Sequence, residues 1–232
     1  MKIIISDFDC TFFTNEYLEN IRLINKFVSK GNMFIIATGR NLTHLKKDIS
    51  GYNIDYSYLI CNDGGVIFDK TDTCIYRQNI DDDIVKSIFD FLNKDTNNHN
   101  IYIDDSLNYV TDTSSMANAI ISQYNDYDKA LETLNTITSN YPSVHGYLSE
   151  NWINITNKVV NKANGIKELV KLTKINSDDI YTIGDNINDL DMIKEYHGYV
   201  VSDGIEKIKE YAEGVVESFK DLIDIVDESS NN

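Results

Sequence analysis

Two aspartates, Asp7 and Asp9, directly follow Lys2–Ser6, a short apolar run rich in isoleucine. Residues i and i+2 of an extended chain point to the same side, so both carboxylates can face one cleft. Like charges this close raise a carboxyl pKa unless a cation neutralises one of them. The pair therefore indicates either a reactive acidic centre or a plain turn in which the aspartates accept hydrogen bonds from backbone amides.

Further polar residues follow or open other predicted elements. They are Thr38 after the apolar run Met33–Ala37, Lys162 at a helix start, and Asp185 with Asp189 after the run Ile180–Ile183. Together they can supply a carboxylate nucleophile, an acid, and a hydroxyl and an ammonium group for phosphate. The remaining carboxylates suit Mg²⁺, which prefers oxygen ligands and is typically held by one or two carboxylates with phosphate and water.

Short apolar runs alternate with helical spacings at both ends of the chain. The expected strands are Lys2–Ser6, Met33–Ala37, Tyr58–Cys61, a hairpin of 66–68 and 74–76, Ile180–Ile183, Tyr199–Val201 and 215–216. This alternation predicts a Rossmann-like α/β core with a parallel sheet and right-handed crossovers. Ligands bind beyond the carboxyl ends of such strands, where Asp7, Thr38 and Asn62 stand.

The middle of the chain has a different texture. Its expected elements are a helix at Asp82–Leu92, strands at 101–103 and 107–110, a helix at Tyr127–Ile137, and strands at 144–148 and 152–155. The order α-β-β-α-β-β predicts a small antiparallel sheet covered by two helices. We therefore expect residues 1–80 and 158–232 to form the core and residues 81–157 to form an inserted α+β domain.

The composition restricts the partners and the compartment. The 232 residues carry a formal net charge of -16, which repels the phosphate backbone and makes nucleic-acid binding a poor expectation. No apolar run approaches the roughly 18 residues of a membrane span, and no apolar signal core opens the chain. Three cysteines without a framework spacing suggest reduced thiols in the cytoplasm. We expect a monomer or a weak homodimer.

Four motifs, taken in order, resemble the haloacid dehalogenase (HAD) superfamily of phosphatases. The motif D-x-D-x-T is matched by Asp7-Phe8-Asp9-Cys10-Thr11, the strand-end Thr by Thr38-Gly39-Arg40, the helix-opening Lys by Lys162, and G-D-x-x-N-D by Gly184-Asp185-Asn186-Ile187-Asn188-Asp189. The inserted domain is similar to the small form of the type IIB cap. The resemblance thus points to the Cof-like branch, which is rich in sugar-phosphate phosphatases, and it spans nearly the whole chain.

The resemblance implies a role for each matching residue. Asp7 would attack phosphorus and form an aspartyl-phosphate, and Asp9 would act as general acid and then as general base. Mg²⁺ would be held by the Asp7 carboxylate, the backbone carbonyl of Asp9, and Asp185, with Asp189 as an outer ligand. The phosphoryl oxygens would be held by Thr38, Gly39, Lys162 and Asn188. The cap would close over the substrate and set specificity.

The chain departs from the family pattern at two places. Cys10 stands where the family usually has Gly, so it is either a packing residue or a change to the cleft. The turn Asn62-Asp63-Gly64-Gly65 differs from the usual Asn-Gly-Ala, and it either lines the cleft or is a plain turn. Aromatic residues of the cap (Tyr102, Tyr109, Tyr147 and Trp152) are interpreted as its small core in preference to a sugar-stacking platform.

The expected function is hydrolysis of small phosphate monoesters, with sugar or polyol phosphates as the substrate class. A phosphomutase of the phosphomannomutase type is an alternative, but it needs a second, basic phosphate site in the cap. The only Lys or Arg residues between 81 and 157 are Lys86, Lys94 and Lys129, which disfavours it. A non-catalytic phosphate sensor or phospho-acceptor protein is another alternative.

Overall fold

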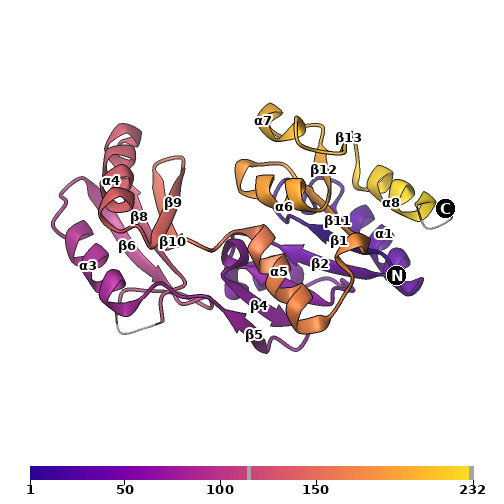
Figure 1. The fold of residues 1–232 in the computed structure, drawn as a ribbon, viewed down its shortest axis with the longest axis horizontal. Coiled ribbons are helices and arrows are strands. Elements are labelled where there is room, and N and C mark those ends of the chain that lie inside the picture. Colours follow the sequence, from indigo (N-terminus) through magenta and orange to yellow (C-terminus); the bar gives the residue numbers. More distant parts are fainter. Residues whose placement is uncertain (114–115, 230–232) are drawn as a thin grey trace. The chain divides into compact units, whose positions relative to one another are not determined.

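The computed structural model describes residues 1–113 and 116–229 and divides into two compact units (Figure 1). The core unit comprises Met1–Gly39, Lys46–Tyr76 and the chain from Asn161 onward, and the cap unit comprises Arg40–Leu45 and Arg77–Val160. The chain therefore leaves the core unit after Tyr76 and returns at Asn161, where the sequence predicted changes after 80 and 157. The short segment Arg40–Leu45 joins the cap unit, which no sequence pattern indicated.

An eight-stranded sheet forms the centre of the core unit, with the order β13-β12-β11-β1-β2-β3-β4-β5. Its strands are β1 (Ile3–Ser6), β2 (Met33–Ala37), β3 (Tyr58–Cys61), β4 (Val66–Asp69), β5 (Cys74–Arg77), β11 (Ile180–Gly184), β12 (His197–Val201) and β13 (Gly214–Val216). Neighbours from β13 to β3 are parallel, and β3 pairs antiparallel with β4. The predicted α/β class with a parallel core sheet is confirmed.

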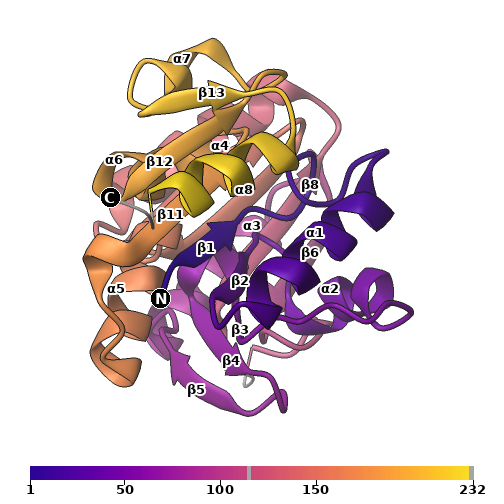
Figure 2. The same cartoon turned by 90° about the vertical axis from the view of Figure 1, so that its right-hand side faces the viewer.

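Strand β1 lies between β2 and β11 (Figure 2). In this register Ile5 pairs with Ile35 on one side and with Thr182 on the other. Because the three strands are parallel neighbours, their carboxyl ends meet at one edge of the sheet. The segments that follow them begin at Asp7, Thr38 and Asp185.

Helices cover both faces of the core sheet. They are α1 (Tyr17–Ser29), α5 (Lys162–Thr173), α6 (Leu190–Glu195), α7 (Glu206–Lys209), α8 (Phe219–Glu228) and the later part of α2 (Leu42–Ile49), whose residues up to Leu45 belong to the cap unit. Ile3, Ile5 and Ile35 pack in one buried cluster with Ile166 and Leu169 of α5. On the other face the ring of Phe34 contacts Phe219 of α8, next to α1 (Figure 2). Burial on both faces explains why the strands read as continuous apolar runs.

The cap unit has a five-stranded sheet of order β7-β6-β8-β10-β9. Its elements are α3 (Asp82–Leu92), β6 (Asn98–Asp104), β7 (Tyr109–Val110), β8 (Ala119–Tyr124), α4 (Tyr127–Asn140), β9 (Val144–Ser149) and β10 (Trp152–Asn157). The sheet residues Ile103, Ile120 and Ile153 share a buried cluster with Val85 of α3 and Leu134 of α4. One sheet face thus packs under both helices.

Strand β8 was missing from the sequence prediction, and the observed order in the cap is α-β-β-β-α-β-β. Its apolar run is only Ala119-Ile120-Ile121, and Ser122-Gln123 separate that run from Tyr124. A run this short indicates a strand only when its partners are known. Here β8 is central, paired antiparallel with β6 on one side and β10 on the other, so tertiary pairing determines the strand.

Candidate active site

The segments after β1, β2 and β3 are fixed by backbone hydrogen bonds to neighbouring strands. The amide of Asp7 donates to the carbonyl of Ile183 at 2.9 Å, and that of Thr38 donates to the carbonyl of Ile60 at 2.8 Å. The amide of Asp63 donates to the Thr38 carbonyl at 3.0 Å. These bonds hold the first residues of each loop at the carboxyl edge of the sheet, which is where the sequence analysis expected the chemistry.

Lys162 is the first residue of α5 and joins two carboxylates. Its Nζ lies 2.5 Å from Oδ1 of Asp7 and 2.6 Å from Oδ1 of Asp189, and its side chain is fully buried. The helix start is secured by Asn161, whose side chain accepts a hydrogen bond from the amide of Asn164 at 2.8 Å. The predicted nucleophile and the predicted lysine are therefore in direct contact, although 155 positions separate them.

Negative charge dominates this cluster. Burial raises the pKa of the Asp7 carboxyl well above its usual range, and the carboxylates of Asp189 and Asp185 raise it further against the opposing Lys162. Burial and the Asp189 carboxylate also raise the pKa of Asp185. Burial alone would lower the pKa of Lys162, but Asp189, Asp7 and Asp63 outweigh it and raise that pKa, so the ammonium stays charged. One ammonium group does not balance these acids.

A divalent cation fits this donor set. Asp7, Asp185 and Asp189 each offer one carboxylate oxygen, and these oxygens lie within 4.8 Å of one another. Oxygen donors with excess negative charge are what Mg²⁺ prefers. Oδ1 of Asp185 also accepts a hydrogen bond from the Thr11 hydroxyl at 3.0 Å, which fixes that carboxylate. The Asp9 carboxylate is not part of this trio; its expected metal contact is through its backbone carbonyl.

Asp189 is already engaged at both oxygens. Oδ1 pairs with Lys162, and Oδ2 accepts hydrogen bonds from the backbone amides of Asp185 and Asn186, each at 3.0 Å. Asn186 in turn caps the turn η3 (Ile187–Asp189) with its side chain. Asp189 therefore organises the loop that carries Asp185 and Asn188, whereas the motif predicted it only as an outer metal ligand.

Asp63 brings the remaining predicted residues into the same cluster. Its Oδ1 accepts a hydrogen bond from Nδ2 of Asn188 at 3.0 Å. A Cβ added at Gly39 would lie 3.2 Å from the same oxygen, so Gly39 packs directly against this carboxylate. Of the two interpretations left open for the turn after β3, the structure favours the one in which it borders the site. In the sequence, this role was indicated by the position of the turn directly after β3, the next strand after the one that precedes Thr38.

Cys10 occupies the left-handed region with φ 59° and is exposed, between Asp9 and Thr11. The loop closes around it, since the amides of Phe12 and Phe13 both donate to the Phe8 carbonyl, at 3.1 and 2.7 Å. Slight burial and the carboxylates of Asp185, Asp9 and Asp7 raise the pKa of the thiol. The raised pKa gives no sign of an activated thiolate, and the side chain is exposed, so Cys10 is not packed in the core.

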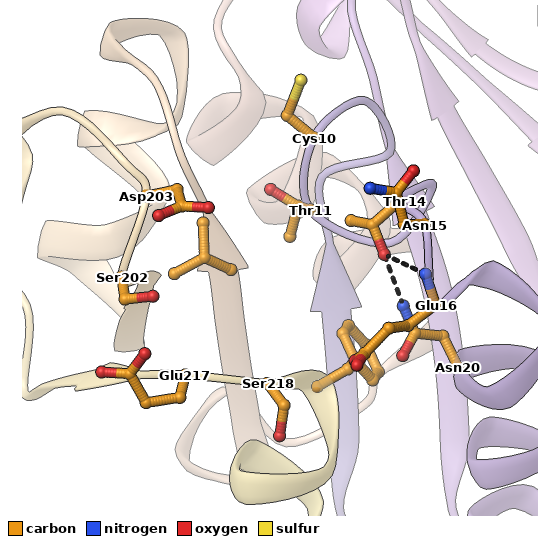
Figure 3. A pocket seen from close by; sticks show the side chains of 12 residues that line it. Cys10, Thr11, Thr14, Asn15, Glu16, Asn20, Ser202, Asp203, Glu217 and Ser218 are labelled. Atoms are coloured by element: carbon orange, nitrogen blue, oxygen red, sulfur yellow. Dashed lines mark hydrogen bonds between the residues drawn. The ribbon is translucent and has the colours of Figure 1, made fainter.

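A hollow of the core unit, about 300 Å³ in volume, is lined in part by Thr11 (Figure 3), whose hydroxyl donates to Asp185 of the site. Its lining side chains are mostly polar and none is basic: Cys10, Thr11, Thr14, Asn15, Glu16, Asn20, Val201, Ser202, Asp203, Glu217, Ser218 and Phe219. Ser202, Asp203 and Glu217 lie on one side of it, and Thr14 and Glu16 lie on the other (Figure 3). Without a cation in its wall, this hollow is unsuited to a second phosphate.

The cap aromatics are arranged differently from the expectation. Tyr102, Tyr109 and Trp152 are outside the buried cluster of the cap unit and line a pocket of about 440 Å³ with Ile121, Ser149 and Asn154. Tyr102, Ile121 and Asn154 alternate with the core residues Ile103, Ile120 and Ile153, so they point to the sheet face away from α3 and α4. The interpretation of these three aromatics as the core of the cap was therefore wrong.

Comparisons with known proteins agree with this site. The family model of haloacid dehalogenase-like hydrolases matches residues 4–145 and 111–222. The 5-amino-6-(5-phospho-D-ribitylamino)uracil phosphatase YcsE of Bacillus subtilis is 23% identical to this chain, covering 94% of this chain and 90% of its own length.

Two solved structures show the same fold. BT1666 of Bacteroides thetaiotaomicron, from a study of phosphatases of the HAD superfamily, matches with a TM-score of 0.82 at 14% identity, over 98% of this chain and 94% of its own. A haloacid dehalogenase-like hydrolase from B. subtilis matches with a TM-score of 0.79 at 16% identity, over 98% and 99% of the two chains. The resemblance seen in the four motifs is confirmed, and the chain belongs to the haloacid dehalogenase-like hydrolases.

Proposed function

We propose that this hydrolase is a Mg²⁺-dependent phosphomonoesterase that acts on small phosphorylated metabolites through an aspartyl-phosphate on Asp7. The observation that carries the proposal is the contact of Lys162 Nζ with Asp7 Oδ1 at 2.5 Å, inside a group of three carboxylates. A buried lysine orients the nucleophile, while the remaining acids suit a cation. A turn in which Asp7 and Asp9 only accept hydrogen bonds from backbone amides would not require this arrangement.

The proposed reaction has two displacements at phosphorus. An oxygen of Asp7 attacks, the bond from phosphorus to the ester oxygen breaks, and Asp9 donates a proton to the departing oxygen. Water then attacks the aspartyl-phosphate, Asp9 accepts the proton from that water, and Asp7 leaves as a carboxylate while phosphate is released. A positioned acid and base of this kind contributes about 10²–10⁴-fold.

The surrounding residues would hold the transferring group. Lys162, Thr38, Gly39 and Asn188 would bind phosphoryl oxygens and stabilise their developing charge. When bound by Asp7, the Asp9 carbonyl, Asp185 and, as an outer ligand, Asp189, Mg²⁺ would supply further positive charge to the phosphoryl group. Lys162 has a second role, because its ammonium group offsets the repulsion between Asp7 and the neighbouring carboxylates.

The cap pocket supports sugar or polyol phosphates as the substrate class. Its lining side chains are aromatic, aliphatic or uncharged polar, as suits a neutral hydroxylated group. The name of the B. subtilis relative YcsE contains a phosphorylated ribityl group, which is a polyol phosphate. Among the described residues, the pocket lining includes no lysine or arginine, which disfavours a phosphomutase, because a mutase must bind a second phosphate.

The expected partner is one small phosphorylated metabolite, with no nucleic acid and no membrane. In residues 1–113 and 116–229, no helix has the length and apolar character needed to cross a lipid bilayer. A cytoplasmic location and a monomer or weak homodimer complete the proposal. Both expectations rest on the acidic composition of the chain and on its three cysteines, which lack the spacing of a disulfide framework.

Phosphate release from a panel of sugar, polyol and nucleotide monophosphates tests the proposal. The wild-type protein should release phosphate with Mg²⁺ and lose this activity in EDTA, and sugar or polyol phosphates should give the highest kcat/KM. A receiver-like sensor would release no phosphate catalytically. Absence of turnover on the whole panel and on a generic aryl phosphate would refute the phosphatase proposal.

A further inference from the structure

Asp63 stands at the meeting point of three segments that carry predicted phosphate-binding residues. Its amide donates to the Thr38 carbonyl at 3.0 Å, and its Oδ1 accepts from Nδ2 of Asn188 at 3.0 Å. Its carboxylate also packs against Gly39, with 3.2 Å from Oδ1 to a Cβ added there. The side chain is buried, so these contacts are shielded from solvent.

The backbone of this turn is unusual and closely packed. Asn62, Asp63 and Gly64 all have positive φ, at 50°, 53° and 98°. A Cβ on Gly64 would lie only 2.2 Å from the carbonyl oxygen of Asn161, the residue before Lys162. Asp and Asn adopt this left-handed conformation more readily than most side chains. The turn thus fixes Asp63 relative to the start of α5.

A carboxylate is an odd neighbour for a phosphate, because like charges repel. The cluster already contains Asp7, Asp185 and Asp189. The charge of Asp63 therefore cannot attract phosphate directly, although it helps to keep Lys162 charged. Its use lies in accepting a hydrogen bond, since a carboxylate oxygen can only accept and so requires the nitrogen of the Asn188 amide on its side.

We propose that Asp63 is a positioning residue that acts through Asn188. By accepting a hydrogen bond from Nδ2, Asp63 fixes the Asn188 side-chain amide with its nitrogen toward Asp63. The second hydrogen on Nδ2 then stays available for a phosphoryl oxygen. This inference rests on the proposed function, because it assigns the orientation of one phosphate-binding side chain. It also explains why the turn after β3 is held so firmly beside Gly39 and Lys162.

A double-mutant cycle of Asp63→Gly and Asn188→Ala tests the assignment. Glycine is chosen because it tolerates the positive φ of position 63 without added strain. Each single variant should lower kcat/KM by about 10- to 100-fold, as expected for loss of one charge-assisted hydrogen bond. The kcat/KM of the double variant should lie within about threefold of that of the less active single variant, because both changes remove the same interaction. Losses that multiply in the double variant would overturn the proposal.

Asp63→Asn is the conservative variant. Its amide oxygen can still accept from Asn188, so it should keep kcat/KM within about tenfold of wild type. If the melting temperature of Asp63→Gly shows that this variant does not fold, Asp63→Asn still tests the proposal. A loss in Asp63→Asn as large as that in Asn188→Ala would overturn the proposal. Asp69→Ala is the matched control, because Asp69 accepts hydrogen bonds from Thr71 in an exposed turn and should leave kcat/KM unchanged.

Calorimetry of the same four proteins measures their affinity for inorganic phosphate in the presence of Mg²⁺. This measurement distinguishes a failure of the proposed function from a failure of the proposed role of Asp63. If wild type hydrolyses nothing but the two substitutions are still coupled in phosphate binding, the proposed function fails and the role of Asp63 stands. If turnover is present and the substitutions are independent, the proposed function stands and the role of Asp63 fails. Absence of both turnover and phosphate binding overturns both.

Discussion

Lys162 and Asp189 form an ion pair, with 2.6 Å between Nζ and Oδ1, in which neither side chain is exposed. The pair joins the start of α5 to the loop after β11, and Lys162 extends it to Asp7. Two charges buried this completely are costly unless both partners are present. The catalytic cluster and the stability of the core unit are therefore linked through Lys162.

Lys162→Met should lower the free energy of unfolding by about 3–5 kcal/mol, because it leaves Asp7 and Asp189 buried without a countercharge. Urea denaturation at neutral pH, followed by circular dichroism, measures the change. Lys171→Met is the control: its ion pair with Glu168 is exposed on the lysine side and should contribute at most about 1 kcal/mol. Equal stability of the two variants would contradict the structural role of Lys162.

Mg²⁺ should raise the melting temperature of the wild-type protein, and EDTA should reverse the rise. A ligand that binds only the folded state at about 100 times its Kd stabilises by about 2.7 kcal/mol. Asp185→Asn should lose most of this response because it removes one of the three clustered carboxylates. Asp191→Asn, an exposed acid two positions beyond Asp189, should respond as wild type does. An undiminished response in Asp185→Asn would place the cation elsewhere.

Cys10→Gly should stabilise the core unit. At φ 59° a side chain with a Cβ costs about 1–2 kcal/mol relative to glycine, and the greater freedom of glycine in the unfolded chain offsets part of this. We expect a net gain of about 0.5–1 kcal/mol in the free energy of unfolding. Cys74→Gly, in the exposed strand β5, should instead lose stability. A loss in both variants would show that Cys10 packs usefully where it is.

The cap unit should lose stability in acid through Asp95. Partial burial alone would raise the pKa of this carboxyl, but hydrogen bonds from Asn97, Tyr124 and Thr133 outweigh it and lower the pKa. A carboxyl whose pKa is lower in the folded state stabilises above its unfolded pKa, about 3.9, and loses that contribution as pH falls through the folded value. Stability of the wild type should therefore decline from about pH 5 toward pH 2.

Fluorescence of the single tryptophan, Trp152 in β10, follows this unit during urea denaturation at each pH. Asp95→Asn should show a shallower decline than wild type, because the group that titrates has been removed. Asp90→Asn, which changes an exposed carboxyl on α3, is the control and should keep the wild-type slope. If Asp95→Asn declines as steeply as wild type, the acid sensitivity comes from other groups.

The strands of the core could be predicted because they are buried on both faces and therefore read as uninterrupted apolar runs. The positions of Asp7, Thr38 and Lys162 could be predicted because each follows such a strand or opens a helix, whereas the roles of the HAD-motif residues stay predictions. The contact of Asp63 with Asn188 could not, since 125 positions separate the two residues and only the close packing of the turn after β3 brings them together. Strand β8 was missed for a similar reason, because its pairing with β6 and β10 determines it.

The orientation of the cap aromatics also required the structure. Tyr102 is preceded by Ile101 and followed by Ile103, and both faces of β6 thus look apolar in sequence. Only Ile103 belongs to the buried residues of the cap cluster, with Ile101 packed at its margin, while Tyr102 lines the pocket on the other face. A strand with apolar residues on both faces gives no sign of which face the helices cover.

The central claim is that the Asp7 carboxylate receives the phosphoryl group. The most direct test is acid quenching of a reaction with a ³²P-labelled sugar or polyol phosphate within milliseconds, followed by mapping of any label on the protein. The account predicts Mg²⁺-dependent label on the peptide that contains Asp7, no label in Asp7→Asn or in EDTA, and no turnover by Asp7→Asn. Label on another residue, or turnover that persists in Asp7→Asn, would contradict it.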